Sequence, residues 1–142
     1  AQGLGEKRAT NLVAINSLAR RKINTSYHSD FAMAPMEPLT LAWTAINRVT
    51  SGGNLVSQDQ RVNAYTAMKA ITISAAKTLN LAHKIGSIEI GKTANFVLLD
   101  KNPLKIEPIK IKDIKVLATV HKGQFHINKS ANLKPMLDEH AF

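Results

Sequence analysis

The chain has 142 residues, 44% hydrophobic and 20% charged, so it can bury one core but falls short of a (β/α)8 barrel, which needs about 250 residues. It contains no cysteine, which excludes disulfides, cysteine-based zinc fingers and a thiol nucleophile. The net charge of +9 is compatible with a nucleic-acid or anionic-membrane partner, but the basic residues lie in separate short groups without interleaved aromatics, so we assign them to a solvated surface.

The first half of the chain alternates between helical and extended patterns. Apolar periodicity predicts a helix over residues 8–21, and alternating β-formers predict a strand over residues 23–29. A proline-bounded loop follows, and a second helix is predicted over residues 38–48 because Pro38 suits the first helical position. Residues 62–80 are predicted to be helical, with a break near Thr72.

The second half has a different texture, with glycines between short β-type runs. Strands are predicted over residues 87–90, 95–99, 114–121 and 124–127. Lys122-Gly123, between the last two runs, suits a hairpin turn because glycine accepts a positive φ. The change of texture near residue 82 divides the chain into residues 1–81 and 82–142.

Asp30 is the first candidate for a functional centre. It comes directly after the predicted strand and before an irregular loop, which is where barrel and open-sheet enzymes keep their catalytic groups. The competing interpretation is that its carboxylate only bonds nearby backbone N–H groups, as aspartate does in many turns. Spacing alone favours this structural role.

Several motifs carry a resemblance to a known family. They are HSDFAMAPMEPL at 28–39, GSIEIGKTANFVLLD at 86–100, NPL at 102–104, and IKDIKVLATV with a following glycine over 111–123. Together they resemble the metal-dependent amidohydrolase superfamily, in particular its branch that hydrolyses N-substituted amides and the subgroup often labelled exoenzyme-regulatory protein. The similarity covers residues 8–128 and corresponds to the C-terminal part of such an enzyme.

The resemblance implies an α/β fold built from two incomplete pieces. Residues 1–81 are expected to be the C-terminal part of the (β/α)8 metallo-hydrolase barrel, with its last helix-strand step and the following helices. Residues 82–142 are expected to be the C-terminal half of the small β-sandwich that flanks the barrel, with a polar tail.

The resemblance also implies a divalent metal cofactor, expected to be zinc, in the full-length enzyme. Asp30 matches the aspartate that contacts the metal site and acts as base and then acid during amide hydrolysis. His28, Phe31 and Met33 are the candidates for substrate contact. The family's other ligands, including its His-x-His pair, are not in this sequence, so the 142-residue chain is expected to be inactive alone.

The implied partners are a small-molecule amide-type substrate, the missing N-terminal part of the same protein and, as an option, further copies of the chain. No membrane partner is expected, because the sequence contains no apolar run long enough to span one, and nucleic acid is disfavoured. The alternative function is a non-catalytic regulatory or binding module, including one associated with nucleic acid. The compartment stays open, with the cytoplasm favoured over secretion, and the true N-terminus is expected to lie upstream.

Overall fold

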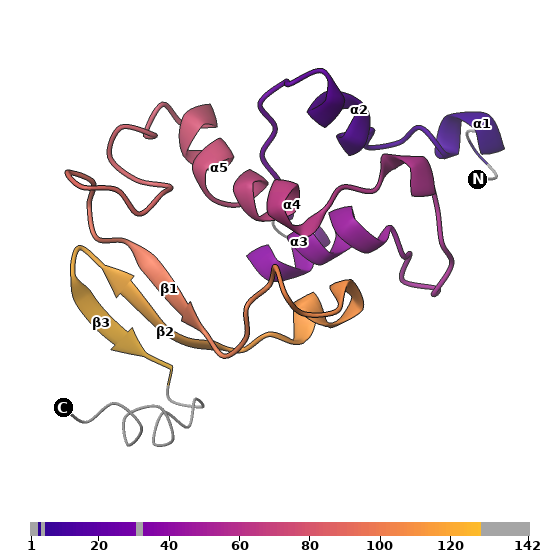
Figure 1. Cartoon of the computed structure of the whole chain (residues 1–142). Helices are drawn as coiled ribbons and strands as arrows, with labels where there is room; N and C mark the ends of the chain where they lie inside the picture. The colour runs from indigo at the N-terminus through magenta and orange to yellow at the C-terminus, as the bar shows by residue number, and fades with distance from the viewer. Residues whose placement is uncertain (1–2, 4, 31–32, 129–142) are drawn as a thin grey trace.

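The computed structural model of the chain describes residues 3, 5–30 and 33–128. Helices fill its first half and a three-stranded antiparallel sheet its second half (Figure 1). The elements are α1 (Glu6–Ala9), α2 (Ile15–Arg20), α3 (Pro38–Asn47), η2 (Gln58–Gln60), α4 (Ala64–Ala70), α5 (Ile73–Thr78), β1 (Phe96–Leu99), η3 (Pro108–Asp113), β2 (Val116–His121) and β3 (Gln124–Ile127). Within this described part, no helix has the length and apolar character needed to cross a bilayer.

The N-terminal helical region differs from the sequence prediction. The single helix predicted over residues 8–21 is wrong, because α1 and α2 are separated by a turn in which Val13 has a φ of 53°. The carbonyl oxygens of Leu12 and Val13 accept hydrogen bonds from the guanidinium of Arg48, at 3.0 and 3.3 Å. The positive φ of Val13 takes the backbone out of the helical path, and the bonds to Arg48 hold the resulting turn in place.

Residues 23–30 run without forming a strand, so the strand predicted over residues 23–29 is not present as a paired element. A strand is defined by its ladder, and this segment has no neighbouring strand in the described part of the chain. Side chains hold it in place instead. The amide Nδ2 of Asn24 donates to the carbonyl oxygen of Ser74 at 3.1 Å and to the hydroxyl of Thr78 at 3.2 Å, which ties the segment to α5.

The central helix α3 begins and ends where its sequence indicates. Pro38 occupies the first turn, where the missing N–H costs nothing, and the helix ends at Asn47. Arg48 follows with a φ of 54°, and its N–H closes the last turn on the carbonyl oxygen of Thr44 at 2.9 Å. The helix predicted over residues 38–48 is therefore confirmed to within one residue.

The helical stretch predicted over residues 62–80 is divided into α4 and α5, as the threonine in its middle predicted. The side chain of Asn63 caps α4 by accepting the N–H of Thr66 at 2.8 Å. Thr72 leaves the helical conformation and its hydroxyl donates to the carbonyl oxygen of Met68 at 2.7 Å. This local bond offers the backbone an alternative to continuing the helix.

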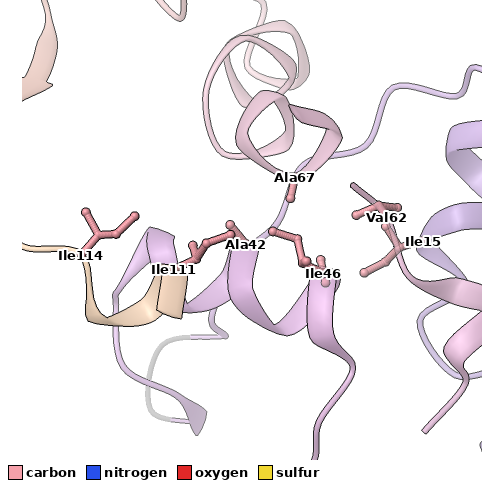
Figure 2. Close-up of a cluster of buried hydrophobic side chains, with 8 residues drawn as sticks. Ile15, Ala42, Ile46, Val62, Ala67, Ile111 and Ile114 are labelled. Carbon is pink, nitrogen blue, oxygen red and sulfur yellow. The ribbon is translucent and has the colours of Figure 1, made fainter. Parts of the chain in front are cut away.

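The hydrophobic core lies around α3 and draws on both halves of the chain (Figure 2). Ala42 and Ile46 point from α3 into the centre, with Ala67 of α4 above them and Ile111 of η3 beside them. The buried members of the cluster are Ile15, Ala42, Ala45, Ile46, Val62, Ala67, Ile111 and Ile114.

The sheet has the order β1-β2-β3, with both neighbouring pairs antiparallel. The predicted hairpin between β2 and β3 is confirmed, since Lys122 and Gly123 have φ values of 51° and 82°, as a type I′ turn requires. The strand predicted over residues 87–90 is absent, and Ile88 in that stretch is exposed. Alternating apolar residues there do not face a partner sheet in the described part of the chain.

Hydrogen bonds, like the core, join the two halves of the chain. The indole Nε1 of Trp43 donates to the carbonyl oxygen of Ile109 at 2.7 Å, and Nδ2 of Asn47 donates to the carbonyl oxygen of Pro108 at 3.0 Å. Lys112 lies over the Trp43 ring, 4.8 Å from its centroid. The described parts of the two halves therefore pack against each other where α3 meets η3, and the division of the chain into the domains 1–81 and 82–142 stays a prediction.

Candidate functional site

Asp30 lies at the end of the segment over residues 23–30, where the chain turns into the loop. Its φ of 57° is a left-handed conformation that aspartate tolerates better than most residues. Its N–H donates to Nδ1 of His28 at 3.1 Å, and its carbonyl oxygen accepts the N–H of Met33 at 3.2 Å. The backbone on both sides of Asp30 is therefore fixed by local hydrogen bonds.

The carboxylate of Asp30 is exposed and makes no hydrogen bond or ion pair with any residue that the structure describes. The structural interpretation of Asp30, in which the carboxylate bonds nearby N–H groups, stays open, because residues 31 and 32 lie outside the described residues. A carboxylate at the end of an anchored segment, without a partner among the described residues, is available to a proton or a cation. Its catalytic role stays a prediction.

His28 has a defined tautomer in this arrangement. Because Nδ1 accepts the N–H of Asp30, that nitrogen carries no proton and the neutral ring holds its proton on Nε2. Nε2 is then a hydrogen-bond donor rather than a metal ligand, and the side chain is exposed. The geometry agrees with the expected use of His28 for substrate contact, without testing it.

The two other predicted contact residues have different standing. Met33 is 80% exposed and follows Asp30 at the start of the loop, so its thioether is free to meet an apolar group. Phe31 lies outside the described residues. The structure brings His28, Asp30 and Met33 together through local hydrogen bonds.

The residues near Asp30 do not form a complete metal site. Among the residues described, no group of three or more His, Cys, Asp or Glu side chains is placed to hold a metal ion. Catalytic zinc takes about three protein ligands, and Asp30 offers one while His28 presents a donor. The chemistry of the donor set fits a metal only if other residues complete the site.

Two clefts flank the segment that leads to Asp30. The first, which we call the Arg48 cleft, has a volume of about 380 Å³ and lies between this segment, α2 and α3, with His28 and Arg48 in its lining. The second, of about 350 Å³, lies between the segment, α2, α4 and α5, with Lys69 and Lys77 in its lining. Thr25 and Tyr27 border both clefts, so the segment runs as a ridge between two hollows.

The backbone of this ridge is not used by the rest of the described chain. No main-chain N–H of residues 24–29 donates a hydrogen bond to a described residue, whereas the N–H of Ile23 donates to the carbonyl oxygen of Leu18 at 3.1 Å. Unpaired main-chain groups beside an open hollow are what an extended segment uses to add itself to an edge.

Tyr27 is the one side chain on the ridge that packs against the hydrophobic core. Burial disfavours its phenolate and raises the pKa of Tyr27 to about 12. The ring is neutral at physiological pH and contributes apolar surface to both clefts.

No sequence pattern indicated a special role for Arg48. Arginine at a helix C-terminus is normally a solvated cation that complements the helix dipole. Here only 8% of the Arg48 surface is exposed. Its guanidinium holds the turn before α2 through the carbonyl oxygens of Leu12 and Val13. No periodicity separates a buried arginine of this kind from a surface one.

Comparison with known proteins gives the fold and site a context. Residues 1–127 match the model of the Amidohydrolase family. The chain is 28% identical over 121 residues to an N-substituted formamide deformylase from Arthrobacter pascens. The aligned region covers 85% of the chain and 22% of that protein. It is 27% identical over 130 residues to the YtcJ protein of Bacillus subtilis (strain 168), which covers 89% of the chain and 25% of that protein.

A solved structure extends the comparison to the fold. The crystal structure of an amidohydrolase from Thermotoga maritima MSB8 superposes with a TM-score of 0.61 at 21% identity, covering 81% of this chain and 26% of that one. The chain thus spans about a quarter of the length of the proteins it matches. Because the family model covers most of its residues, the chain belongs to the Amidohydrolase family.

Proposed function

We propose that this chain is the C-terminal part of a metal-dependent hydrolase that cleaves C–N bonds in small non-peptide amides, with Asp30 as its proton shuttle. The observation that carries the proposal is the family match over residues 1–127 together with the free carboxylate that ends the anchored segment. N-substituted formamides are the first substrates to test, because a relative with 28% identity is named for its action on them.

In this proposal Asp30 moves one proton per turnover. Its carboxylate accepts a proton from the attacking water as the oxygen forms its bond to the amide carbon. It returns that proton to the amine nitrogen as the C–N bond breaks, so the products are a carboxylic acid and an amine. A divalent metal, with zinc as the candidate, would be held in part by Asp30 and would supply Lewis-acid activation of water and carbonyl.

The neighbours of Asp30 take positioning roles in this proposal. His28 donates from Nε2 to an oxygen of the substrate, since Nδ1 is engaged by the N–H of Asp30. Met33 and Phe31 provide apolar contact for the group carried on the amide nitrogen, which the 80% exposure of Met33 supports.

The rest of the enzyme would come from an upstream part of the same polypeptide. The unused main chain of residues 24–29 suits a barrel strand whose neighbours lie in that part, consistent with residues 1–81 as the end of a (β/α)8 barrel. Residues 82–142 would be half of a β-sandwich. The sheet supports this, since one face carries only apolar side chains and several are exposed. These side chains are Phe96, Leu98, Ala118, Val120, Phe125 and Ile127.

The chain alone would be inactive, because Asp30 is exposed to solvent and lacks the other metal ligands. Its open faces would be covered by the upstream part or, in isolation, by further copies of the chain in a homo-oligomer.

The decisive experiment compares Asp30→Asn with Asp113→Asn in the complete polypeptide. Asp113 is an exposed carboxylate at the end of η3, so it is a matched control for charge. We expect Asp30→Asn to keep its thermal stability and most of its metal and to lose turnover of an N-substituted formamide by at least about 100-fold, since a general base contributes that much or more. Near-normal turnover in Asp30→Asn would reduce Asp30 to a turn residue.

A further inference from the structure

Arg48 carries a buried charge that the described chain does not neutralise. Its exposed fraction is 8%, and its Nη1 and Nη2 donate to the carbonyl oxygens of Val13 and Leu12 at 3.3 and 3.0 Å. Its Nε is buried and has no hydrogen-bond partner. Two neutral carbonyls therefore use one edge of the guanidinium, and the N–H on Nε is left without an acceptor.

Among the residues whose side chains the structure describes, which leaves out Glu6, no carboxylate pairs with Arg48. The ion pairs in that part of the chain are Lys92–Glu89 and Lys110–Glu107, both distant in sequence from Arg48. A buried cation without a partner is costly, and so is a buried N–H without an acceptor. Both costs are relieved at once by a carboxylate, whose two oxygens match the fork of N–H groups on a guanidinium.

The Arg48 cleft indicates what would carry that carboxylate. Its walls include the apolar side chains of Val13, Ile15, Leu18, Leu41 and Ala45. A free small anion gains little from such walls, whereas a protein segment buries its own apolar side chains against them. One wall is formed by residues 25–28 of the ridge. The main-chain N–H groups of these residues donate to no described residue, so they can pair with an extended segment.

We propose that the Arg48 cleft receives an extended segment from the upstream part of the same polypeptide, and that an Asp or Glu in this segment, flanked by apolar residues, pairs with Arg48. The proposal rests on the larger polypeptide proposed above, which is consistent with matched proteins about four times as long as the chain. Arg48 is then a positioning residue: its charge fixes the register of the incoming segment beside the ridge that ends in Asp30.

A crystal structure of the complete polypeptide tests the contact directly. We expect a carboxylate oxygen from an upstream residue within hydrogen-bond distance of Nε of Arg48. Water, a backbone carbonyl or a free anion at that position would overturn the proposal. This structural test needs neither a variant nor an activity assay, so its outcome is independent of the role of Asp30.

Thermal unfolding of the same protein supplies the second test, with Arg48→Gln compared with Arg21→Gln. Arg21 is an exposed arginine that directly follows α2, and its side chain makes no hydrogen bond with a described residue, so it is the matched control. A carboxylate paired with Arg48 has a lowered pKa in the folded state, so its contribution is present at neutral pH and is lost as pH falls. We expect Arg48→Gln to lower Tm by several degrees near neutral pH and the gap to wild type to shrink toward about pH 4.

Three outcomes of that test would contradict the pairing. A Tm gap that does not change with pH would mean that Arg48 acts only through packing and its bonds to Leu12 and Val13. A gap as large for Arg21→Gln would mean a general charge effect. A rise in Tm on adding acetate, seen in wild type and absent in Arg48→Gln, would assign the site to a free carboxylate instead of a segment. The other titratable side chains that line the cleft are His28 and Tyr27, and both are present in wild type and in the variant.

Discussion

Gly86 lies so close to Ala76 that a β-carbon on Gly86 would be 2.6 Å from the Cβ of Ala76. The same atom would be 3.0 Å from the Cα of Ile73, and Gly86 has a φ of 96°, which side-chain-bearing residues rarely adopt. The loop after α5 therefore approaches the helix at a point where only a hydrogen atom fits. This contact holds the connection between the helical half and the sheet.

We predict that Gly86→Ala destabilises the chain by about 3 kcal/mol, because steric overlap adds to the cost of the backbone conformation. Gly91→Ala is the matched control: Gly91 has a φ of 88° but no atom within 4 Å of the added carbon. We expect the control to cost about 1 kcal/mol, from conformation alone. Denaturant unfolding of the two variants measures both values, and equal costs would show that the contact with Ala76 relaxes freely.

Tyr27 predicts a loss of stability in strong alkali. Its pKa is raised by burial to about 12, above the usual value near 10, so the folded state holds the phenolic proton more tightly than the unfolded state. The contribution is fully present below about pH 10 and is lost as the pH rises toward about 12, for a total of about 2 kcal/mol.

The measurement compares unfolding of wild type and Tyr27→Phe across this range, with Tyr65→Phe as the control. Tyr65 is 61% exposed, so Tyr65→Phe controls for the removal of a tyrosine hydroxyl outside the core. In an ultraviolet titration of the native chain, the part of the phenolate absorbance that Tyr27→Phe lacks should appear toward about pH 12. Ionisation of Tyr27 near the usual tyrosine value of about 10 would contradict its burial.

The isolated chain is predicted to lack a tight zinc site. Among the residues described, Asp30 has no second and third ligand around it, and a single carboxylate does not hold zinc in competition with water. Calorimetric titration of the purified chain should give only weak heat, unchanged in Asp30→Asn. One tight stoichiometric site that disappears in Asp30→Asn would mean that the chain, alone or as an oligomer, completes the metal site itself.

The sequence predicted the structure correctly wherever a residue determines the backbone conformation of its own neighbours. Pro38 starts α3, Thr72 interrupts the helical stretch before α5, and Lys122-Gly123 makes the hairpin, each for a reason contained within a few residues. The motif around Asp30 likewise predicted a carboxylate at the end of an extended segment. The structure adds that this carboxylate has no partner among the residues it describes and that His28 anchors the backbone of Asp30.

Sequence patterns failed where a distant partner decides the outcome. Periodicity over residues 8–21 could not reveal that Arg48 captures the carbonyl oxygens of Leu12 and Val13 and so interrupts the helix. Alternation over residues 23–29 predicts a strand, but a ladder also needs neighbours, which the described part does not supply. The burial of Arg48 has no local signature either, because it depends on the cleft formed by elements far apart in sequence.

The bonds from Trp43 to Ile109 and from Asn47 to Pro108 have a consequence for how such a protein can be recombined. Both donors lie before residue 81 and both acceptors after it, and Ile111 fills the space beside Ala42. A crossover between two related genes near residue 81 would join a donor helix from one parent to an acceptor turn from the other, with mismatched side chains between them. The stretch from α3 through η3 should therefore be taken from one parent as a single block.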